Sequence, residues 1–256
     1  MENKYKIDYG KFDTKTFVNN KPFPNLTIDY LFQDRFLDEI LDNYPDESKL
    51  NWWKYDNHFE KKLAFNNVST LHESFQKYFN LVNSREFVNH LEKLTGITGL
   101  VADPSLYGGG LHKINRGGKL DVHADFNYHK ITGWKRRLNL ITFLNRDWKS
   151  EYGGYTEYWD TSMTKCVKKV LPVFNRTVIF CVDKDSYHGH PEPLLCPPDM
   201  CRRSLATYYY TLHDEKIDDL DYHSTDYKRR PSEEINEKVE KMREQRRKGR
   251  LEDMTT

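Results

Sequence analysis

Four segments between His123 and Tyr210 are the most informative part of the sequence: His-Ala-Asp (123–125), Arg-Arg-Leu-Asn-Leu-Ile-Thr-Phe-Leu-Asn (136–145), Tyr-His-Gly-His-Pro (187–191) and Arg-Arg-Ser-Leu-Ala-Thr-Tyr-Tyr-Tyr (202–210). Side chains two residues apart on an extended segment point to the same side of the backbone. His123 and Asp125 would therefore face one way, and a second His from a distant strand would complete three ligands on one face of a metal ion. Two His and one carboxylate in this facial arrangement suit Fe(II) and leave coordination positions open.

The order of these segments carries more weight than any one of them. His-x-Asp alone occurs by chance in many chains. Here it is followed by Gly153-Gly154, by a His at 188 or 190, and by Arg202-x-Ser204, each on or beside a strand-like run. Gly189 and Pro191 indicate that the chain turns after the first of the two His.

Composition excludes several classes of protein. The chain has 256 residues, a formal net charge of +1 and 14% aromatic residues, so neither nucleic acid nor a membrane is a partner that charge alone would attract. The four Cys form no C-x-x-C pair, which favours a reduced setting. No apolar signal segment begins the chain, and no run has the length of a membrane span. We expect a soluble, cytoplasmic protein with no membrane partner.

Helical patterns dominate the first part of the chain. Apolar residues recur at helical spacing from Asp29 to Tyr44, Thr70 and Glu73 form a capping box before a second helix, and a third runs from Ser84 to Leu94 and ends at Gly96. The helical part, about 25–96, would cover one sheet.

After Gly96 the sequence changes to short β-rich runs separated by Gly-Gly turns. The runs are Leu111–Ile114, Lys119–His123, Arg137–Leu144, Thr156–Trp159, Lys165–Val170, Thr177–Val182 and Ser204–Leu212. Strands at this spacing without helical crossovers are typical of an antiparallel double sheet. The sequence predicts an α+β fold with a jelly-roll core, about 97–213, and N-terminal supporting helices.

The last residues differ again in composition. Residues 228–250 mix Lys and Arg with Glu and contain few large apolar side chains. We therefore predict one domain over 1–220 and a charged, solvated C-terminal tail over 221–256. The basic end at 246–250 is the only feature that would favour nucleic acid as a partner.

From about Pro22 to Thr211, the sequence resembles the Fe(II)- and 2-oxoglutarate-dependent dioxygenases of the prolyl 4-hydroxylase type, and it is similar to their oxygen-sensing prolyl hydroxylase domain group. The matching residues are His123-x-Asp125, Phe143-Leu144-Asn145-x-Asp147-Trp148 followed by Gly153-Gly154, Asn175-Arg176, His188-Gly189, and Arg202-x-Ser204 leading into Tyr208-Tyr209-Tyr210. The resemblance implies a double-stranded β-helix and Fe(II) held by His123, Asp125 and His188. It further implies 2-oxoglutarate as cosubstrate, O2, and ascorbate as a candidate reductant.

The resemblance also implies a site for the cosubstrate. Arg202 would bind its distal carboxylate through two parallel hydrogen bonds, and Ser204 would add a hydroxyl donor from the same face. Two departures concern this site, because Ile114 and Phe143 stand where such enzymes commonly place tyrosines. The candidates to supply hydrogen bonds in their place are His112, Asn139 and Thr156.

The implied activity is hydroxylation of a prolyl residue in a peptide or protein, with release of succinate and CO2. Candidate walls at the mouth of the site are Trp134, Tyr128, Tyr155 and Trp159. Other readings are the same chemistry on free proline, another amino acid or a small molecule; a non-catalytic jelly-roll binding module; and a nucleic-acid-modifying oxygenase that uses the basic tail.

Overall fold

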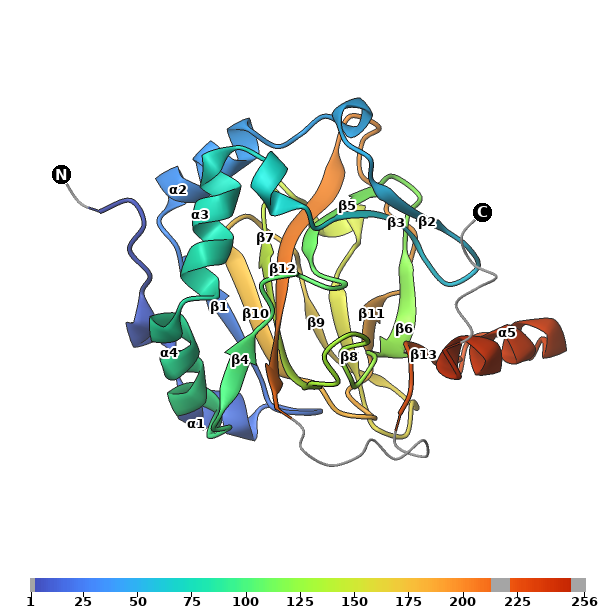
Figure 1. Cartoon of the computed structure of the whole chain (residues 1–256). Coiled ribbons are helices and arrows are strands. Elements are labelled where there is room, and N and C mark those ends of the chain that lie inside the picture. The colour runs from blue at the N-terminus through green and yellow to red at the C-terminus, as the bar shows by residue number, and fades with distance from the viewer. Residues whose placement is uncertain (1–2, 213–221, 250–256) are drawn as a thin grey trace.

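Two antiparallel β-sheets face each other in the computed structural model, which describes residues 3–212 and 222–249 (Figure 1). The strand order of the large sheet is β1 (Asn25–Asp29), β10 (Arg176–Cys181), β7 (Lys135–Phe143), β12 (Cys201–Thr211), β5 (Gly110–Asn115), β3 (Lys61–Phe65) and β2 (Trp53–Asp56), with β4 (Leu100–Ala102) also paired to β12. The small sheet runs β13 (Asp226–Tyr227), β6 (Leu120–Ala124), β11 (His188–His190), β8 (Thr156–Trp159) and β9 (Cys166–Val170).

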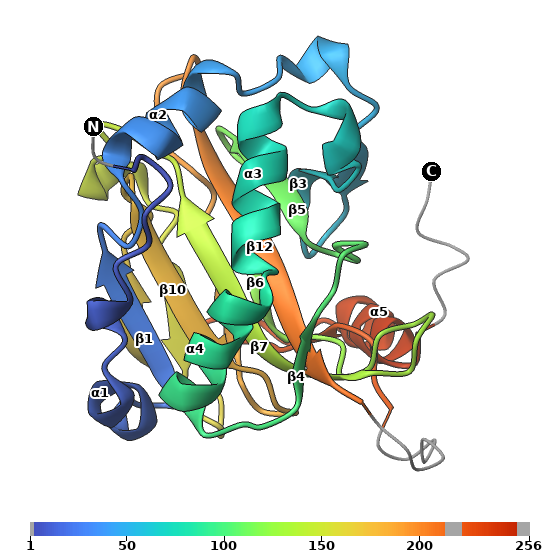
Figure 2. The ribbon, with the colours of Figure 1, turned by 60° about the vertical axis from the view of Figure 1, so that its left-hand side comes forward.

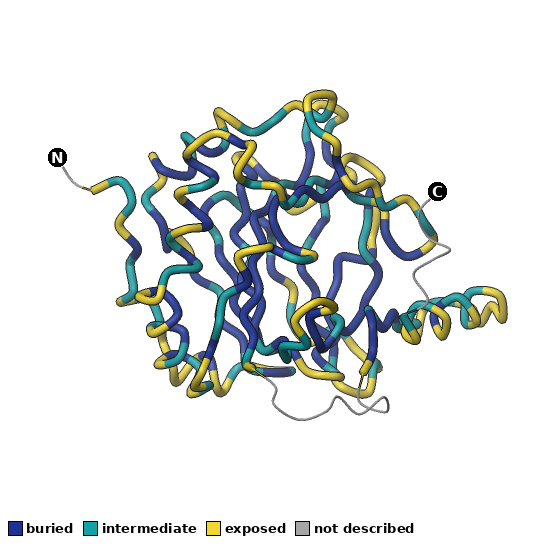
Figure 3. The backbone as a smooth tube through the Cα atoms, in the orientation of Figure 1, coloured by how far each residue is buried: buried dark blue, intermediate teal, exposed yellow. Residues whose placement is uncertain are grey.

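Helices cover the outer face of the large sheet (Figure 2). They are α1 (Thr14–Asn19), α2 (Asp34–Asp42), α3 (Glu73–Val82) and α4 (Arg85–Thr95), whereas α5 (Glu237–Arg247) lies beside the small sheet. The predicted α+β jelly-roll with supporting N-terminal helices is therefore confirmed. The strands of both sheets are largely buried, while exposed backbone follows the helices and loops (Figure 3).

Alternation along β12 and β7 divides their side chains between the two faces of the large sheet. Leu205 and Tyr209 pack with the helices in the larger cluster, as do Leu138 and Leu140 of β7. Phe143 belongs instead to a smaller cluster with Val178, Phe180 and Tyr158. Burying one face against helices leaves the opposite face free to carry polar residues between the sheets.

Local signals explain where the helices begin and end. Ser84 caps α4 through a hydrogen bond from the Phe87 N–H, and Gly96 ends it with φ +73°, as predicted. The predicted capping box at Thr70 is wrong, because Thr70 belongs to a 3-10 turn and His72 caps α3. The first predicted helix begins later than Asp29, since residues 25–29 pair with β10 as a strand.

The C-terminal segment is not simply a solvated tail. Its residues 226–227 form β13, which pairs with β6, and Arg243 of α5 is buried. Arg243 donates hydrogen bonds to Glu233 and Glu240, which offset the cost of burying its charge. The predicted boundary at 220–221 and Arg250 of the basic end lie outside the described residues. Within the described ranges, no helix has the length and apolar character to span a membrane.

Candidate metal centre

Three side chains with metal-ligating atoms meet between the two sheets. His123 lies in β6 and Asp125 directly follows that strand, while His188 opens β11 and pairs with His123 in register. His123 Nε2 lies 3.5 Å from Asp125 Oδ1, and His188 Nε2 lies 3.4 Å from Asp125 Oδ2. The ligand atoms of all three residues lie within 4.8 Å of one another. The structure thus brings the predicted ligand set together.

Backbone carbonyls orient both imidazole rings. His123 Nδ1 lies 2.8 Å from the carbonyl oxygen of Asp121, and His188 Nδ1 lies 2.9 Å from that of Ser186. A carbonyl can only accept, so each Nδ1 carries the proton and each Nε2 presents a lone pair to the centre. These tautomers are the ones that a metal ion requires.

Gly189 lets the two ligand-bearing strands approach closely. A Cβ at this position would lie 2.8 Å from the carbonyl oxygen of Asp121 and 2.9 Å from that of Leu120. Backbone atoms cannot move aside as a side chain can, so the close pairing of β11 with β6 requires glycine here.

Arg136 and Asn139 hold the carboxylate of Asp125. Arg136 Nη2 lies 3.2 Å from Asp125 Oδ2, and Asn139 Nδ2 donates to the same oxygen at 2.7 Å. Arg136 also donates twice to Asn139 Oδ1, at 2.9 and 2.7 Å. Burial acts to raise the pKa of Asp125, but the charge of Arg136, aided by the two His, holds it well below its usual range. Burial lowers the pKa of His188 to about 4. An ionised carboxylate beside neutral imidazole fits a divalent metal ion.

The role of Arg136 was not predicted from the sequence. Its guanidinium lies between two aromatic rings, 4.5 Å from the centre of Phe126 and 3.4 Å from that of Tyr208. The prediction that Asn139 faces the cosubstrate meets a competing contact, because its amide is engaged by Asp125 and Arg136. Position in the strand gives the direction of a side chain but not its hydrogen-bond partner.

Arg202 is buried between the sheets. Its Nε donates to the carbonyl of Gly154 at 3.0 Å and its Nη2 to Thr156 Oγ1 at 3.2 Å. No ion pair joins it to an acidic side chain among residues 3–212 and 222–249, and burial lowers its pKa to about 10. A guanidinium buried in this way calls for an anionic partner. Ser204 follows on the same face and is also buried.

The other predicted positions surround Arg202. Ile114 lies opposite it in register, and Phe143 lies beneath the guanidinium at 4.9 Å. His112 lies opposite Ser204, but its Nε2 is 3.2 Å from the carbonyl of Gly108 and therefore donates there. Thr156, predicted to bind the cosubstrate, lies next to Arg202 and accepts its hydrogen bond.

His190 differs from what the sequence suggested. The Gly-His-Pro pattern favoured a turn after His188, yet His190 is a residue of β11, 4% exposed, and neither ring nitrogen has a hydrogen-bond partner among the described residues. Burial, and then the positive charge of Arg202, hold its pKa well below the usual value. The ring is therefore neutral.

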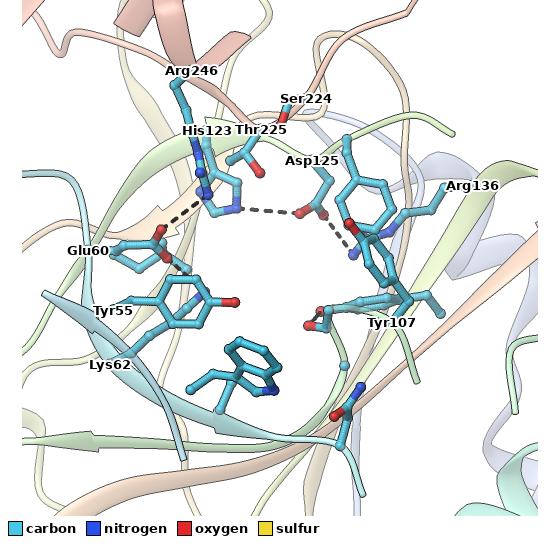
Figure 4. A pocket seen from close by; sticks show the side chains of 18 of the residues that line it. Tyr55, Glu60, Lys62, Tyr107, His123, Asp125, Arg136, Ser224, Thr225 and Arg246 are labelled. Carbon is cyan, nitrogen blue, oxygen red and sulfur yellow. Dashed lines mark hydrogen bonds and ion pairs between the residues drawn. The ribbon is translucent and has the colours of Figure 1, made fainter. Parts of the chain in front are cut away.

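A cavity of about 330 Å³ opens onto His123 and Asp125 (Figure 4). Its aromatic walls are Trp53, Tyr55, Phe65, Tyr107, Phe126, Tyr208 and Tyr227, and its charged residues besides Asp125 are Glu60, Lys62, Arg136 and Arg246. The predicted wall residues Trp134, Tyr128, Tyr155 and Trp159 are not among the described residues that line it. Apart from Phe126, which follows Asp125, these walls come from segments distant from the metal ligands in sequence, which strand spacing could not reveal.

Glu60 joins two cations at the edge of this cavity. It is 2% exposed, with Lys62 Nζ 3.0 Å from its Oε2 and Arg246 Nη2 3.5 Å from its Oε1. Burial acts to raise the pKa of Glu60, but Lys62 and Arg246 outweigh it and the pKa is lowered. The pKa of Lys62 is raised despite burial, because of Glu60. Arg246 belongs to α5, so the C-terminal segment forms part of the cavity.

With the ligand geometry established, the comparison with known families is decisive. Residues 109–210, which include His123, Asp125, His188 and Arg202, match the model of the 2OG-Fe(II) oxygenase superfamily. This segment is similar to the oxygenase domains of that superfamily. The family implies Fe(II), 2-oxoglutarate and O2, and the tautomers of the two His, the ionised Asp125 and the buried Arg202 fit these groups.

Solved structures of this oxygenase type share the fold. A Pseudomonas putida prolyl-4-hydroxylase is 12% identical with a TM-score of 0.56, and the match covers 78% of this chain and 99% of that one. A Trichoplax adhaerens prolyl hydroxylase in complex with a hypoxia inducible factor peptide is 17% identical with a TM-score of 0.56, covering 77% and 88%. HygX from Streptomyces hygroscopicus, with nickel, 2-oxoglutarate and hygromycin B bound, is 11% identical with a TM-score of 0.50, covering 73% and 82%.

These likenesses establish the double-stranded β-helix of the oxygenase and its resemblance to the prolyl hydroxylase type. A comparison with curated protein sequences finds no match.

Proposed function

We propose that this oxygenase hydroxylates a prolyl residue in a peptide or protein and releases succinate and CO2. One observation carries the proposal: the metal-ligand set His123, Asp125 and His188 lies between the sheets with Arg202, a buried guanidinium that has no acidic partner among the described residues. A metal site beside a buried cation could bind the two ends of a dicarboxylate cosubstrate that also chelates the metal.

The residues have distinct tasks in this proposal. His123, Asp125 and His188 would hold Fe(II) on one face, and Arg202 would bind the distal carboxylate of 2-oxoglutarate. When bound, the iron and cosubstrate supply the oxidising power for hydroxylation of an unactivated C–H bond. Arg136 and Asn139 keep Asp125 ionised and orient its carboxylate, which would hold that ligand in place for the metal.

The cavity supports a prolyl substrate. Tyr55, Tyr107 and Trp53 offer aromatic faces to an apolar ring near His123 and Asp125. The two cations Lys62 and Arg246 are already paired with Glu60. A free amino acid would bring an ammonium and a carboxylate that need counter-charges, whereas a peptide segment is neutral at these positions. This favours a residue within a chain over free proline.

A small molecule is the second candidate substrate. The cavity volume of about 330 Å³ lies at the lower end of the range for small-molecule sites. HygX, which shares the fold, has hygromycin B bound in its structure.

The test is an anaerobic absorption titration of the metal-free protein with Fe(II) and 2-oxoglutarate, with Asp125→Ala as control. A visible charge-transfer band that needs both components and is lost in the variant is the expected result. Absence of the band from the wild-type protein would contradict the proposal and favour a non-catalytic binding module.

The substrate is tested separately, with peptide libraries, free proline and small molecules, each with O2 and with ascorbate as the proposed reductant. Mass spectrometry of the products reports the addition of one oxygen atom. Hydroxyproline in peptides is the expected result, and turnover of small molecules alone would contradict the prolyl assignment while leaving the oxygenase chemistry intact.

A further inference from the structure

The imidazole of His190 is a buried polar group without a protein partner. The side chain is 4% exposed, and both ring nitrogens lack hydrogen bonds within the described residues. Leaving a buried polar group unpaired is costly, so such groups are rare unless a ligand or water completes them. The other two His of this region, His123 and His188, each use one nitrogen for a backbone carbonyl and present the other to the metal site.

Strand geometry places His190 beside the anion site. In the pairing of β11 with β8, His188 lies opposite Tyr158 and Gly189 opposite Glu157. Because the strands are antiparallel, the positions two residues beyond the His188–Tyr158 pair are His190 on β11 and Thr156 on β8. Side chains two residues apart point the same way, so His190 and Thr156 share the inner face with His188 and Tyr158. Thr156 accepts a hydrogen bond from Arg202, so the ring is a neighbour of the guanidinium.

An irregularity in the adjacent strand does not change this direction. Between the pairs His188–His123 and His190–Leu120, β11 advances by two residues and β6 by three. The extra residue therefore belongs to β6, and alternation along β11 is retained.

Few other donors near Arg202 are free to bind a ligand. Ile114 and Phe143, which lie next to Arg202, carry no polar side-chain atom. Asn139 donates to Asp125, and His112 donates to the carbonyl of Gly108. Besides side-chain hydroxyls, His190 offers unused donor capacity on this face within the described residues.

We propose that His190 donates a hydrogen bond to the distal carboxylate of 2-oxoglutarate beside Arg202. The inference rests on the proposed function, since it assigns a residue to the cosubstrate of that site. It makes His190 a binding residue and not a metal ligand.

The experiment measures 2-oxoglutarate affinity by calorimetry with Mn(II) in place of Fe(II), so that no turnover is needed. His190→Leu removes the donor at similar volume, and His190→Gln keeps an N–H donor. The matched control is Tyr158→Phe, which removes another buried hydroxyl without a partner, on the neighbouring strand, that Arg202 does not influence. Each protein is also titrated with 2-oxobutanoate, which chelates metal but lacks the distal carboxylate.

His190→Leu is expected to weaken 2-oxoglutarate binding roughly 10- to 150-fold, as for loss of a hydrogen bond to a charged group. Its affinity for 2-oxobutanoate is expected to stay within about twofold, and Tyr158→Phe to stay within about twofold for both ligands. His190→Gln is expected to recover part of the loss.

Equal weakening of both ligands by His190→Leu would overturn the inference, because the ring would then act on the metal or on the shape of the site. Unchanged 2-oxoglutarate affinity in His190→Leu would also overturn it while leaving the proposed function standing. Failure of the wild-type protein to bind 2-oxoglutarate would overturn both. If His190→Leu does not fold, His190→Gln provides the test. The contradicting result is then that His190→Gln changes the affinities for 2-oxoglutarate and for 2-oxobutanoate by the same factor relative to the wild type.

Discussion

Replacing Arg202 with Met is expected to leave the ligand-free protein nearly as stable as the wild type while removing most of its affinity for 2-oxoglutarate. Met is similar in length but has neither charge nor donors. Ordinarily, truncation of a buried, hydrogen-bonded side chain lowers stability. Arg202 is different, because its charge is buried without an acidic partner among the described residues.

The magnitude follows from two opposing contributions. Burial lowers the pKa of Arg202 from 12.5 to about 10, which corresponds to about 3 kcal/mol against the charged form. The hydrogen bonds to Gly154 and Thr156 contribute about 1.5 kcal/mol each as bonds from a charged donor. The contributions nearly cancel, so the melting temperature of the ligand-free variant is expected to lie within about 4 °C of the wild type.

Affinity responds differently. A carboxylate bound to the guanidinium offsets the free-energy cost of burying its charge. Loss of one member of such a pair costs about 2–5 kcal/mol of binding free energy. The dissociation constant for 2-oxoglutarate is therefore expected to rise roughly 30- to 5,000-fold.

Thermal denaturation with and without Mn(II) and 2-oxoglutarate measures both quantities, because a ligand that binds only the folded state raises its melting temperature. Arg203→Met is the matched control, since Arg203 lies on the opposite face over the ring of Tyr44. A fall of more than about 10 °C in the ligand-free Arg202→Met protein, or an intact ligand-induced shift, would refute the reasoning.

Three further predictions concern the metal site and the cavity. His188→Ala is expected to abolish metal binding and the absorption band of Fe(II) with 2-oxoglutarate, whereas His190→Ala is expected to keep Mn(II) binding. Loss of metal binding in His190→Ala but not in His188→Ala would assign the metal ligand to His190. Gly189→Ala is expected to cost about 1–3 kcal/mol in chemical unfolding, because the new Cβ meets backbone carbonyls of β6 at 2.8 and 2.9 Å, and an unchanged midpoint would contradict the close approach. The ion pair of Glu60 with Lys62 is expected to stabilise the fold fully above about pH 4.5, the usual pKa of Glu60, and to lose its effect as pH falls through the lowered pKa of the folded state. On the alkaline side the raised pKa of Lys62 keeps the contribution full below about pH 10.5. Melting temperatures measured across this pH range are expected to fall at acidic pH more steeply for the wild type than for Glu60→Gln. Identical pH profiles for the two proteins would refute the stabilising role of this ion pair.

Much of the core could be predicted because the central strands of the large sheet have one face against helices and one between the sheets. In β12 this places Arg202 and Ser204 on the inner face and Arg203 and Leu205 on the outer one. The same period of two places His123 and Asp125 together. Ser84 and Gly96 marked the limits of α4 because capping depends on residues next to each other in sequence.

The remainder depends on contacts that local sequence does not encode. β11 has three residues, one of them Gly189, too few to show a period, so the direction of His190 could not be predicted. Asn139 was assigned to the cosubstrate because its strand face was known, whereas its partner Asp125 lies across a bend of the chain. The same limit applies to Arg136, whose aromatic neighbours come from two other segments.

The wall formed by Glu60 and Arg246 joins residues separated by 186 positions. The chain is synthesised from its N-terminus, and the metal ligands and Arg202 all lie within the first 202 residues. The metal ligands and the anion site can thus come together while β13 and Arg246 are still inside the ribosome, and α5 docks last. A nascent or truncated chain that ends before α5 would accordingly retain the ligands and Arg202 but leave Glu60 without one of its two cations.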